Sequence, residues 1–241
     1  QLDFGVLSYT SMVAAINNAK LDIKIVCDVA TDGHPGYIST LWGVHGDSAI
    51  RGPADLRGKI VAVNVIGGGI DMALRVHLRK FGLEAKRDYN VVEVRFPAME
   101  AFLREKKVQA AYFLPSFWYR AQAKGGVRKL FTVAEAIGEN QLLFGVMRTE
   151  FLKQHRAVVS DFFEDYLYAL RWFLDPAHRD EALQITAKYS KRPVKSFAKW
   201  AFTTAGWYRN ANGIPNVKVL QANIDLLVRE GYAKKGISVP D

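Results

Sequence analysis

The sequence predicts an α/β protein, and two features of its pattern carry the prediction. Over the first two thirds of the 241 residues, short β-rich runs alternate with segments that have the apolar spacing of helices. From Arg148 onward the pattern is mostly helical. Strand–helix alternation of this kind is typical of parallel βαβ units, so we expect such units followed by a helical tail.

The first segment of the chain is expected to hold three strands and one helix. An apolar run at 2–8 is typical of a buried strand, and residues 9–20 have the spacing of an amphipathic helix. A second apolar run covers 21–30, and after a turn with Gly and Pro a third, alternating strand is expected over 37–46. Residues 48–59 are expected to form a loop.

A second α/β block follows this loop, and a helical tail completes the chain. The expected strands of the block are 60–66, 90–96, 109–114 and 127–133. Its expected helices are 70–81, 98–107 and 116–124. In the tail, apolar residues of the run 158–174 recur at i, i+3 and i+4 spacing, which predicts a helix with one wide apolar stripe.

The excess of basic residues does not by itself indicate a nucleic-acid-binding protein. Lys and Arg number 33 against 24 Asp and Glu, which gives a formal charge of +9. The basic residues are interleaved with acids, as on a solvated surface, so we expect no nucleic-acid partner. The five histidines and the single cysteine, Cys27, show no metal-ligand spacing, so we expect no metal and no cofactor.

Three consecutive glycines separate an expected strand from an expected helix. Gly67 and Gly69 fit the start of the G-x-G-x-x-G dinucleotide fingerprint, but Met72 occupies the position of its third glycine. Glu93 has a spacing compatible with the ribose-binding acid, so dinucleotide binding remains an alternative. Otherwise the helix start can hold a small anion or the polar edge of a ligand, or the glycines simply permit a tight turn.

Two further strand–helix junctions carry small or hydroxyl side chains. Ser8, Thr10 and Ser11 follow the first expected strand, and Pro115 and Ser116 follow a later one. Ligands of open α/β sheets bind outside the carboxyl ends of strands, so three such junctions predict one cleft between two lobes. Each hydroxyl alone can equally be a helix N-cap. No nucleophile elbow is present, and we expect no catalytic residue and no enzyme.

Four stretches of the chain together resemble the solute-binding proteins of ABC importers of the nitrate, sulfonate and taurine type, including the NMT1/THI5-like branch. The stretches are 2–16, 47–83, 101–126 and 216–239. The most specific part is the run I-x-x-x-x-D-L-x-G-K-x-V-A-V from Ile50 to Val63, followed by the glycine-rich turn. The resemblance extends over nearly the whole chain.

This resemblance implies a type II periplasmic-binding-protein fold, in which two α/β lobes joined by two crossing strands close on a ligand. Lobe one would combine 1–45 with 142–241, including the helical C-terminal tail, and lobe two would cover 46–141. The crossing strands would lie near 37–44 and 140–147. Family members begin with a further strand–helix–strand unit, so we expect lobe one to be incomplete at its N-terminus.

The resemblance also implies a function and a location. The protein would be an extracytoplasmic monomer that delivers a small organic solute to the membrane permease of an ABC importer. No signal peptide is visible in the first residues, so the expected location rests on the family.

The ligand contacts that the resemblance implies lie at the three junctions and on the two crossing strands. They are Ser8, Tyr9, Thr10, Trp42, Gly67, Gly68, Gly69, Ile70, Asp71, Pro115, Ser116, Phe117, Trp118, Asn140 and Gln141. Trp42 and Trp118 can equally be core residues, and Asp71 can equally complement the dipole of its helix.

The residues around the junctions indicate the kind of ligand. No Lys or Arg adjoins any of the three turns, which weakens the case for a bare anion such as nitrate. Aromatic neighbours favour a flat or partly apolar molecule, and Asp71, if it faces the cleft, would suit a ligand with an amine. We expect a sulfonate, a pyrimidine precursor or an aromatic acid.

Two other functions are compatible with the same fold. Eukaryotic pyrimidine-synthesis relatives of the family are enzymes that use histidine, cysteine and iron, and they would require a cysteine-rich run where this chain has only Cys27. The ligand-sensing domain of a transcription regulator would require a DNA-binding region, and the tail of this sequence contains none.

Overall fold

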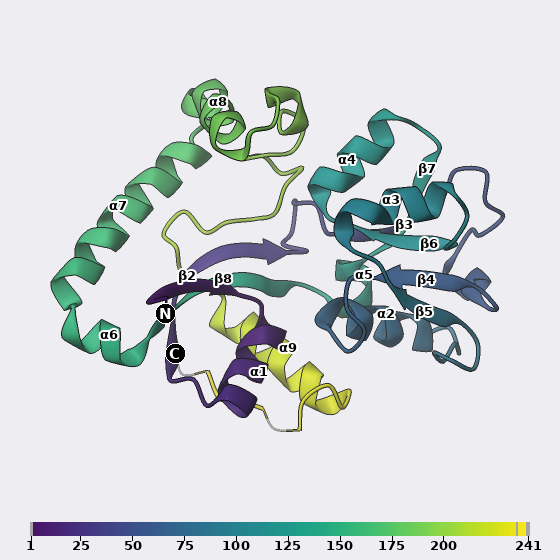
Figure 1. Cartoon of the computed structure of the whole chain (residues 1–241), viewed down its shortest axis with the longest axis horizontal. Coiled ribbons are helices and arrows are strands. Elements are labelled where there is room, and N and C mark those ends of the chain that lie inside the picture. Colours follow the sequence, from purple (N-terminus) through teal and green to yellow (C-terminus); the bar gives the residue numbers. More distant parts are fainter. Residues whose placement is uncertain (1, 235, 240–241) are drawn as a thin grey trace.

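The computed structural model describes residues 2–234 and 236–239, and it arranges them around two separate sheets (Figure 1). Residues 1, 235, 240 and 241, which the prediction assigns to lobe one, lie outside the described residues. The first sheet has the strand order β1-β8-β2, and the second has the order β5-β4-β6-β3-β7. The two α/β lobes expected from the sequence are therefore present.

The first sheet brings together strands from both ends of the chain. It consists of β1 (Phe4–Leu7), β2 (Ile23–Asp32) and β8 (Asn140–Arg148). β8 lies in the middle and runs antiparallel to both neighbours. The helices α1 (Tyr9–Ala19) and α9 (Val217–Arg229) pack against each other below this sheet (Figure 1). Their apolar side chains form a core cluster with those of β8.

The second sheet contains the predicted βαβ block. Its strands are β3 (Leu41–His45), β4 (Ile60–Val63), β5 (Asn90–Glu93), β6 (Ala110–Phe113) and β7 (Val127–Thr132). Its helices are α2 (Gly69–Arg79), α3 (Phe96–Arg104), α4 (Pro115–Ala123) and α5 (Val133–Ile137). β4 pairs in parallel with β5 and β6, as alternation predicts, and the central strand β6 is buried throughout.

The predicted boundary between the lobes falls one strand too late. β3 belongs to the second sheet, where it pairs antiparallel with β6 and β7, although the prediction places 37–44 on a crossing strand. The chain therefore leaves the first sheet at Asp32 and enters the second at Leu41. Alternation of apolar residues predicts a strand but not its partners, which is why this error arises. The chain returns to the first sheet in β8.

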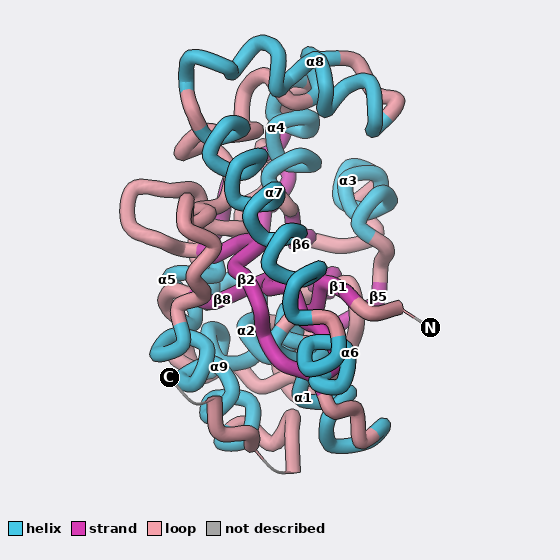
Figure 2. Tube along the Cα trace, turned by 90° about the vertical axis from the view of Figure 1, so that its left-hand side faces the viewer, coloured by secondary structure: helices cyan, strands magenta, loops and turns pink. Residues whose placement is uncertain are grey.

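The helical tail is confirmed, but its longest helix is less buried than its pattern predicts. The tail contains α6 (Thr149–Gln154), α7 (Arg156–Leu174) and α8 (Arg179–Ser190) ahead of α9. α7 lies on the outside of the first sheet, at the end of the molecule remote from the second (Figures 1 and 2). None of its residues is fully buried, and Val158 and Tyr168 are 59% and 74% exposed.

The remaining helical elements of the described part of the chain are three short 3-10 turns. They cover Pro53–Leu56, Pro176–His178 and Val194–Ser196, and the first lies in the segment predicted to be a loop. Among the described residues, no helix is both long and apolar enough to cross a membrane.

Candidate functional site

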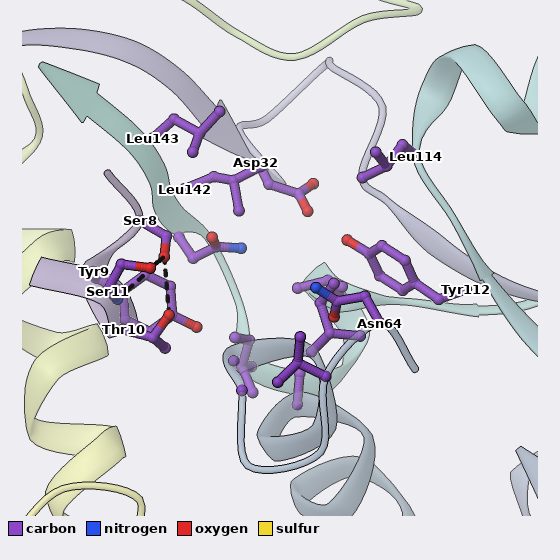
Figure 3. Close-up of a pocket in the computed structure, with 18 of the residues that line it drawn as sticks. Ser8, Tyr9, Thr10, Ser11, Asp32, Asn64, Tyr112, Leu114, Leu142 and Leu143 are labelled. Atoms are coloured by element: carbon purple, nitrogen blue, oxygen red, sulfur yellow. Dashed lines mark hydrogen bonds between the residues drawn. The ribbon is translucent and has the colours of Figure 1, made fainter. Parts of the chain in front are cut away.

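A cavity of about 510 Å³ lies where the two lobes face each other (Figure 3). This volume is in the range of small-molecule sites. Both lobes line it, and the lining includes the ends of β2, β4 and β6 and the starts of α1, α2 and β8. The lining residues are Ser8, Tyr9, Thr10, Ser11, Ala14, Asp32, Asn64, Val65, Ile66, Gly67, Gly68, Gly69, Ile70, Ala73, Phe96, Tyr112, Leu114, Val133, Ile137, Asn140, Leu142, Leu143 and Trp207.

The start of α1 forms one wall of the cavity. Ser8 caps this helix, because its hydroxyl accepts a hydrogen bond from the backbone N–H of Ser11 at 3.3 Å. The hydroxyl groups of Ser8 and Thr10 are 2.9 Å apart and hydrogen-bonded. Tyr9 is 4% exposed, and burial raises the pKa of its hydroxyl. The predicted alternative, that Ser8 is an N-cap, is therefore correct, and the residue also lines the cavity.

The glycine turn forms the opposite wall, and two of its glycines have separate reasons to be glycine. Gly67 has a φ of +83°, a left-handed conformation that side chains rarely adopt. A Cβ on Gly69 would lie 2.9 Å from the hydroxyl oxygen of Tyr9 and 3.1 Å from Cγ2 of Thr10. What approaches the backbone here is thus the helix start of the other lobe. Gly68 is the N-cap residue of α2 and has no side chain. The first backbone N–H groups of the helix therefore receive no hydrogen bond from an N-cap side chain.

Asp71 stabilises this turn and does not line the cavity. Its carboxylate accepts hydrogen bonds from the backbone N–H of Gly67 at 2.9 Å and from Nε of Arg75 at 2.8 Å. The hydroxyl of Tyr232 donates to the same carboxylate at 3.3 Å. The side chain is 1% exposed. A carboxylate in the first turn of a helix that also pairs with an Arg four residues on complements the helix dipole, as the alternative interpretation predicts.

The lobes also contact each other beside the cavity. Tyr232 and Glu230 follow α9 in lobe one, whereas their partners Asp71 and Arg79 belong to α2 in lobe two. Arg79 Nη1 lies 2.6 Å from a carboxylate oxygen of Glu230. Met72 of α2 is fully buried within the core cluster of lobe one. The described arrangement is therefore one in which the lobes are packed together.

Asp32 is the charged residue of the cavity lining. It ends β2, is 1% exposed, and accepts hydrogen bonds from the backbone N–H of Thr40 at 3.0 Å and from the Thr40 hydroxyl. Burial raises the pKa of this carboxyl, and its hydrogen bonds act in the opposite direction. Figure 3 shows the Asp32 carboxylate and the Tyr112 hydroxyl directed toward each other across the cavity.

Asn140 and Gln141 are neighbours at the start of β8 but have different surroundings. Asn140 lines the cavity and is 2% exposed, and its side chain forms no hydrogen bond within the described part of the chain. The Gln141 amide instead donates to Asp28 at 2.6 Å and accepts from the backbone N–H of Asn216 at 2.8 Å. Gln141 thus connects elements of lobe one and lies outside the cavity.

The structure separates the expected ligand contacts into two groups. Those at the cavity are Ser8, Tyr9, Thr10, Gly67, Gly68, Gly69, Ile70 and Asn140. Those outside it are Trp42, Asp71, Pro115, Ser116, Phe117, Trp118 and Gln141.

The two tryptophans of the second group are core residues. Trp42 is fully buried and stacks on Phe131 at 4.8 Å between ring centroids. Trp118 is 5% exposed and packs edge-on against Phe113 at 5.7 Å. The junction at the start of α4 contributes Leu114 to the cavity, whereas the three following residues do not line it.

Several cavity residues were not predicted from the sequence. Asp32 and Asn64 follow or end strands, so the same rule that selected Ser8 could have found them. Phe96 ends the expected strand 90–96 and starts α3, so the same rule could have found it as well. Tyr112 and Trp207 carry no comparable signal, because Tyr112 lies inside an apolar strand and Trp207 lies in the irregular segment before α9.

No cluster of metal-ligating side chains is found among residues 2–234 and 236–239. Cys27 is 1% exposed and does not line the cavity. Its Sγ would be 2.5 Å from a Cβ placed on Gly145, so the thiol of this β2 residue packs over Gly145 of β8. Burial raises its pKa, which disfavours the thiolate.

Two α/β lobes with a cavity between them define a fold of the periplasmic-binding-protein type, and comparison with solved structures supports that fold. The aliphatic sulphonate-binding protein SsuA of Escherichia coli matches with a TM-score of 0.75 and 19% identity, over 98% of this chain and 73% of that one. SsuA of Xanthomonas axonopodis pv. citri, bound to MOPS, matches with a TM-score of 0.72 and 20% identity, over 99% and 78%.

The chain belongs to the NMT1-like family, whose model matches residues 1–187. The desulfurization enzyme DSZB shares the fold as well, with a TM-score of 0.71 and 12% identity over 98% of this chain and 80% of that one. No curated protein matches the sequence significantly. At these identities the structural likeness establishes the fold and leaves the ligand and activity to be argued from the residues.

Proposed function

We propose that this protein is a solute-binding protein that captures a small organic molecule between its lobes and delivers it to an ABC importer. The observation that carries the proposal is the cavity of about 510 Å³, lined by both lobes at the ends of their strands. Mostly apolar walls with a few convergent polar groups are typical of small-molecule sites.

The location and partner follow from the same proposal. Solved structures with this fold include periplasmic binding proteins and the ligand-binding component of an ABC-type import system from Staphylococcus aureus. We place this protein outside the cytoplasm, as a monomer that meets the importer permease after the lobes have closed on the solute.

An enzymatic role has less support from the residues of the cavity. DSZB shows that the fold is compatible with catalysis. In this chain the single cysteine is a buried residue of β2 outside the cavity, and the described cavity lining includes no Cys, His or Lys. The hydroxyls of Ser8, Thr10 and Ser11 therefore have no imidazole or amine in the described cavity lining to activate them as nucleophiles.

Native mass spectrometry on the protein incubated with a bacterial metabolite extract tests the proposal. We expect a small-molecule adduct that is lost on denaturation. Gly69→Val should reduce the bound fraction at least ~tenfold, because the new side chain would meet Tyr9 and Thr10 and hold the lobes apart.

Gly52→Val is the matched control. A Cβ at Gly52 meets no heavy atom within 4 Å, and its φ of −147° is extended backbone. The control should retain the adduct and the melting temperature of the wild type. Absence of any adduct from the wild type, or an equal adduct in Gly69→Val, would count against the proposed function.

A further inference from the structure

The charge of the cavity differs from what an anion-binding site requires. Asp32 is the one charged side chain among the described lining residues, and no Lys, Arg or His accompanies it. Sulfonates and carboxylates are usually held by cations or by several N–H donors. The donors of this cavity, which include the uncapped start of α2, are neutral. A carboxylate at 1% exposure inside the cavity would repel them with little screening by water.

The Asp32 carboxylate has no counter-charge within the described residues. Its hydrogen-bond donors are neutral, chiefly the N–H and hydroxyl of Thr40. These bonds favour the ionised form, whereas burial opposes it. A buried carboxylate in this position lacks the cationic partner that such groups normally have.

A second polar group in the cavity also lacks a partner. The Asn140 side chain is buried, lines the cavity and makes no hydrogen bond within the described part of the chain. Buried amides are usually hydrogen-bonded, so an unpartnered one at a cavity marks a ligand contact. The indole N–H of Trp207, another lining residue, is likewise buried without a described partner.

The remaining walls fix the shape of the ligand. Phe96, Tyr112 and Trp207 supply aromatic surface, and Leu114 and Leu142 supply aliphatic surface. Aromatic and aliphatic walls of this kind accommodate a flat ring.

We propose that the solute is a flat, ring-containing molecule with a cationic N–H donor group, such as an amidinium or a protonated amine, that binds Asp32. Asn140 contacts a further polar edge of the ring. This inference rests on the proposed solute-binding function and narrows its ligand class. It excludes simple sulfonates and carboxylates, although SsuA proteins with the same fold are named for sulfonates.

Four compounds of similar size test this assignment by isothermal titration calorimetry. Benzamidine carries the cationic N–H donor, benzamide is its neutral counterpart, and benzoate and benzenesulfonate are anions. We expect the wild type to bind benzamidine at least ~tenfold tighter than benzoate or benzenesulfonate, with benzamide between them, since charge-assisted hydrogen bonds are the stronger ones. Asp32→Asn should reduce the preference for benzamidine over benzoate at least ~tenfold.

The control variant is Asp165→Asn, which removes the same charge from the exposed face of α7 and should leave the preference unchanged. Tighter binding of an anion, an unchanged preference in Asp32→Asn, or no binding of benzamidine at ~1 mM would each overturn the ligand class. If one of those results is found but a metabolite adduct is also observed, the proposed solute-binding function stands and only the ligand class is wrong. Absence of both adduct and benzamidine binding would remove both proposals.

Discussion

Two buried carboxylates on the same strand, Asp28 and Asp32 of β2, have opposite surroundings. They are 2% and 1% exposed, and burial raises the pKa of both. Asp28 accepts hydrogen bonds from the Gln141 amide at 2.6 Å and from the backbone N–H of Asn210 at 2.8 Å. Asp32 is bonded mainly to Thr40 and lines the cavity.

Only one of the two acids also has a positive charge close by. The guanidinium of Arg209 lowers the pKa of Asp28, against the effect of burial, and no cation acts on Asp32 in the same way. The comparison teaches that burial does not distinguish a structural acid from a binding acid. The neighbouring groups do distinguish them. A structural carboxylate has its charge balanced by other residues of the fold, whereas a binding carboxylate has no counter-charge until a ligand supplies one.

The largest difference should appear when each acid is removed. Asp28→Ala leaves the Gln141 amide, the Asn210 N–H and the Arg209 charge without their partner, and we expect it to lower the free energy of unfolding by about 3 kcal/mol. Asp32→Ala should cost about 1 kcal/mol, because the loss of the bonds from buried Thr40 is offset by removal of a buried charge that has no counter-charge. Urea unfolding of both variants measures this, and equal losses would contradict the comparison.

The adjacent residues Asn140 and Gln141 offer a sharper version of the same contrast. Gln141→Ala should cost about 2 kcal/mol, because its hydrogen bonds to Asp28 and Asn216 are lost in a buried position. For a protein of this size that corresponds to a fall in melting temperature of about 4–8 °C. Asn140→Ala, which breaks no side-chain hydrogen bond, should shift it by less than about 2 °C. Differential scanning calorimetry distinguishes the two, and the reverse order would refute our assignment of roles.

The smallest effect is a pH dependence that Asp32 should confer. Because its pKa is higher in the folded than in the unfolded protein, the folded state binds the proton more tightly. The wild type should therefore gain stability relative to Asp32→Asn as the pH falls through the raised pKa, and the gain should be complete below the ordinary value of 3.8. Its size is about 1.4 kcal/mol for each unit by which the pKa is raised. Urea titrations of both proteins from neutral to acid pH measure the difference, and a constant difference would show that Asp32 has an ordinary pKa.

Most of the fold could be predicted from the sequence, because local patterns determine local elements. Every predicted strand and helix of the second block is present, with bounds shifted by a few residues. The pairing of β3 could not be predicted, since hydrogen bonds to β6 and β7 depend on residues more than 60 positions away.

The candidate site could be predicted only where backbone geometry selects the residue. Strand ends and helix starts identified Ser8 and the glycine turn as cavity residues, whereas Asn140 was expected from the family resemblance alone. Trp42 was misplaced because an aromatic residue on a strand gives the same sequence pattern whether it packs in a core or contacts a ligand. Tyr112 was missed for the converse reason, as it lies in an apolar strand and only packing turns its hydroxyl to the cavity.

The burial of Met72 in the core of the other lobe has a kinetic consequence. Any rotation that opens the cavity by separating α2 from α1 must expose this side chain to water. Exposing a buried methionine costs about 1.5–3 kcal/mol. Each 1.36 kcal/mol added to a barrier slows the step about tenfold. Under the proposed function, a side chain outside the cavity would therefore lengthen the residence time of an enclosed solute, and it would do so equally for every ligand.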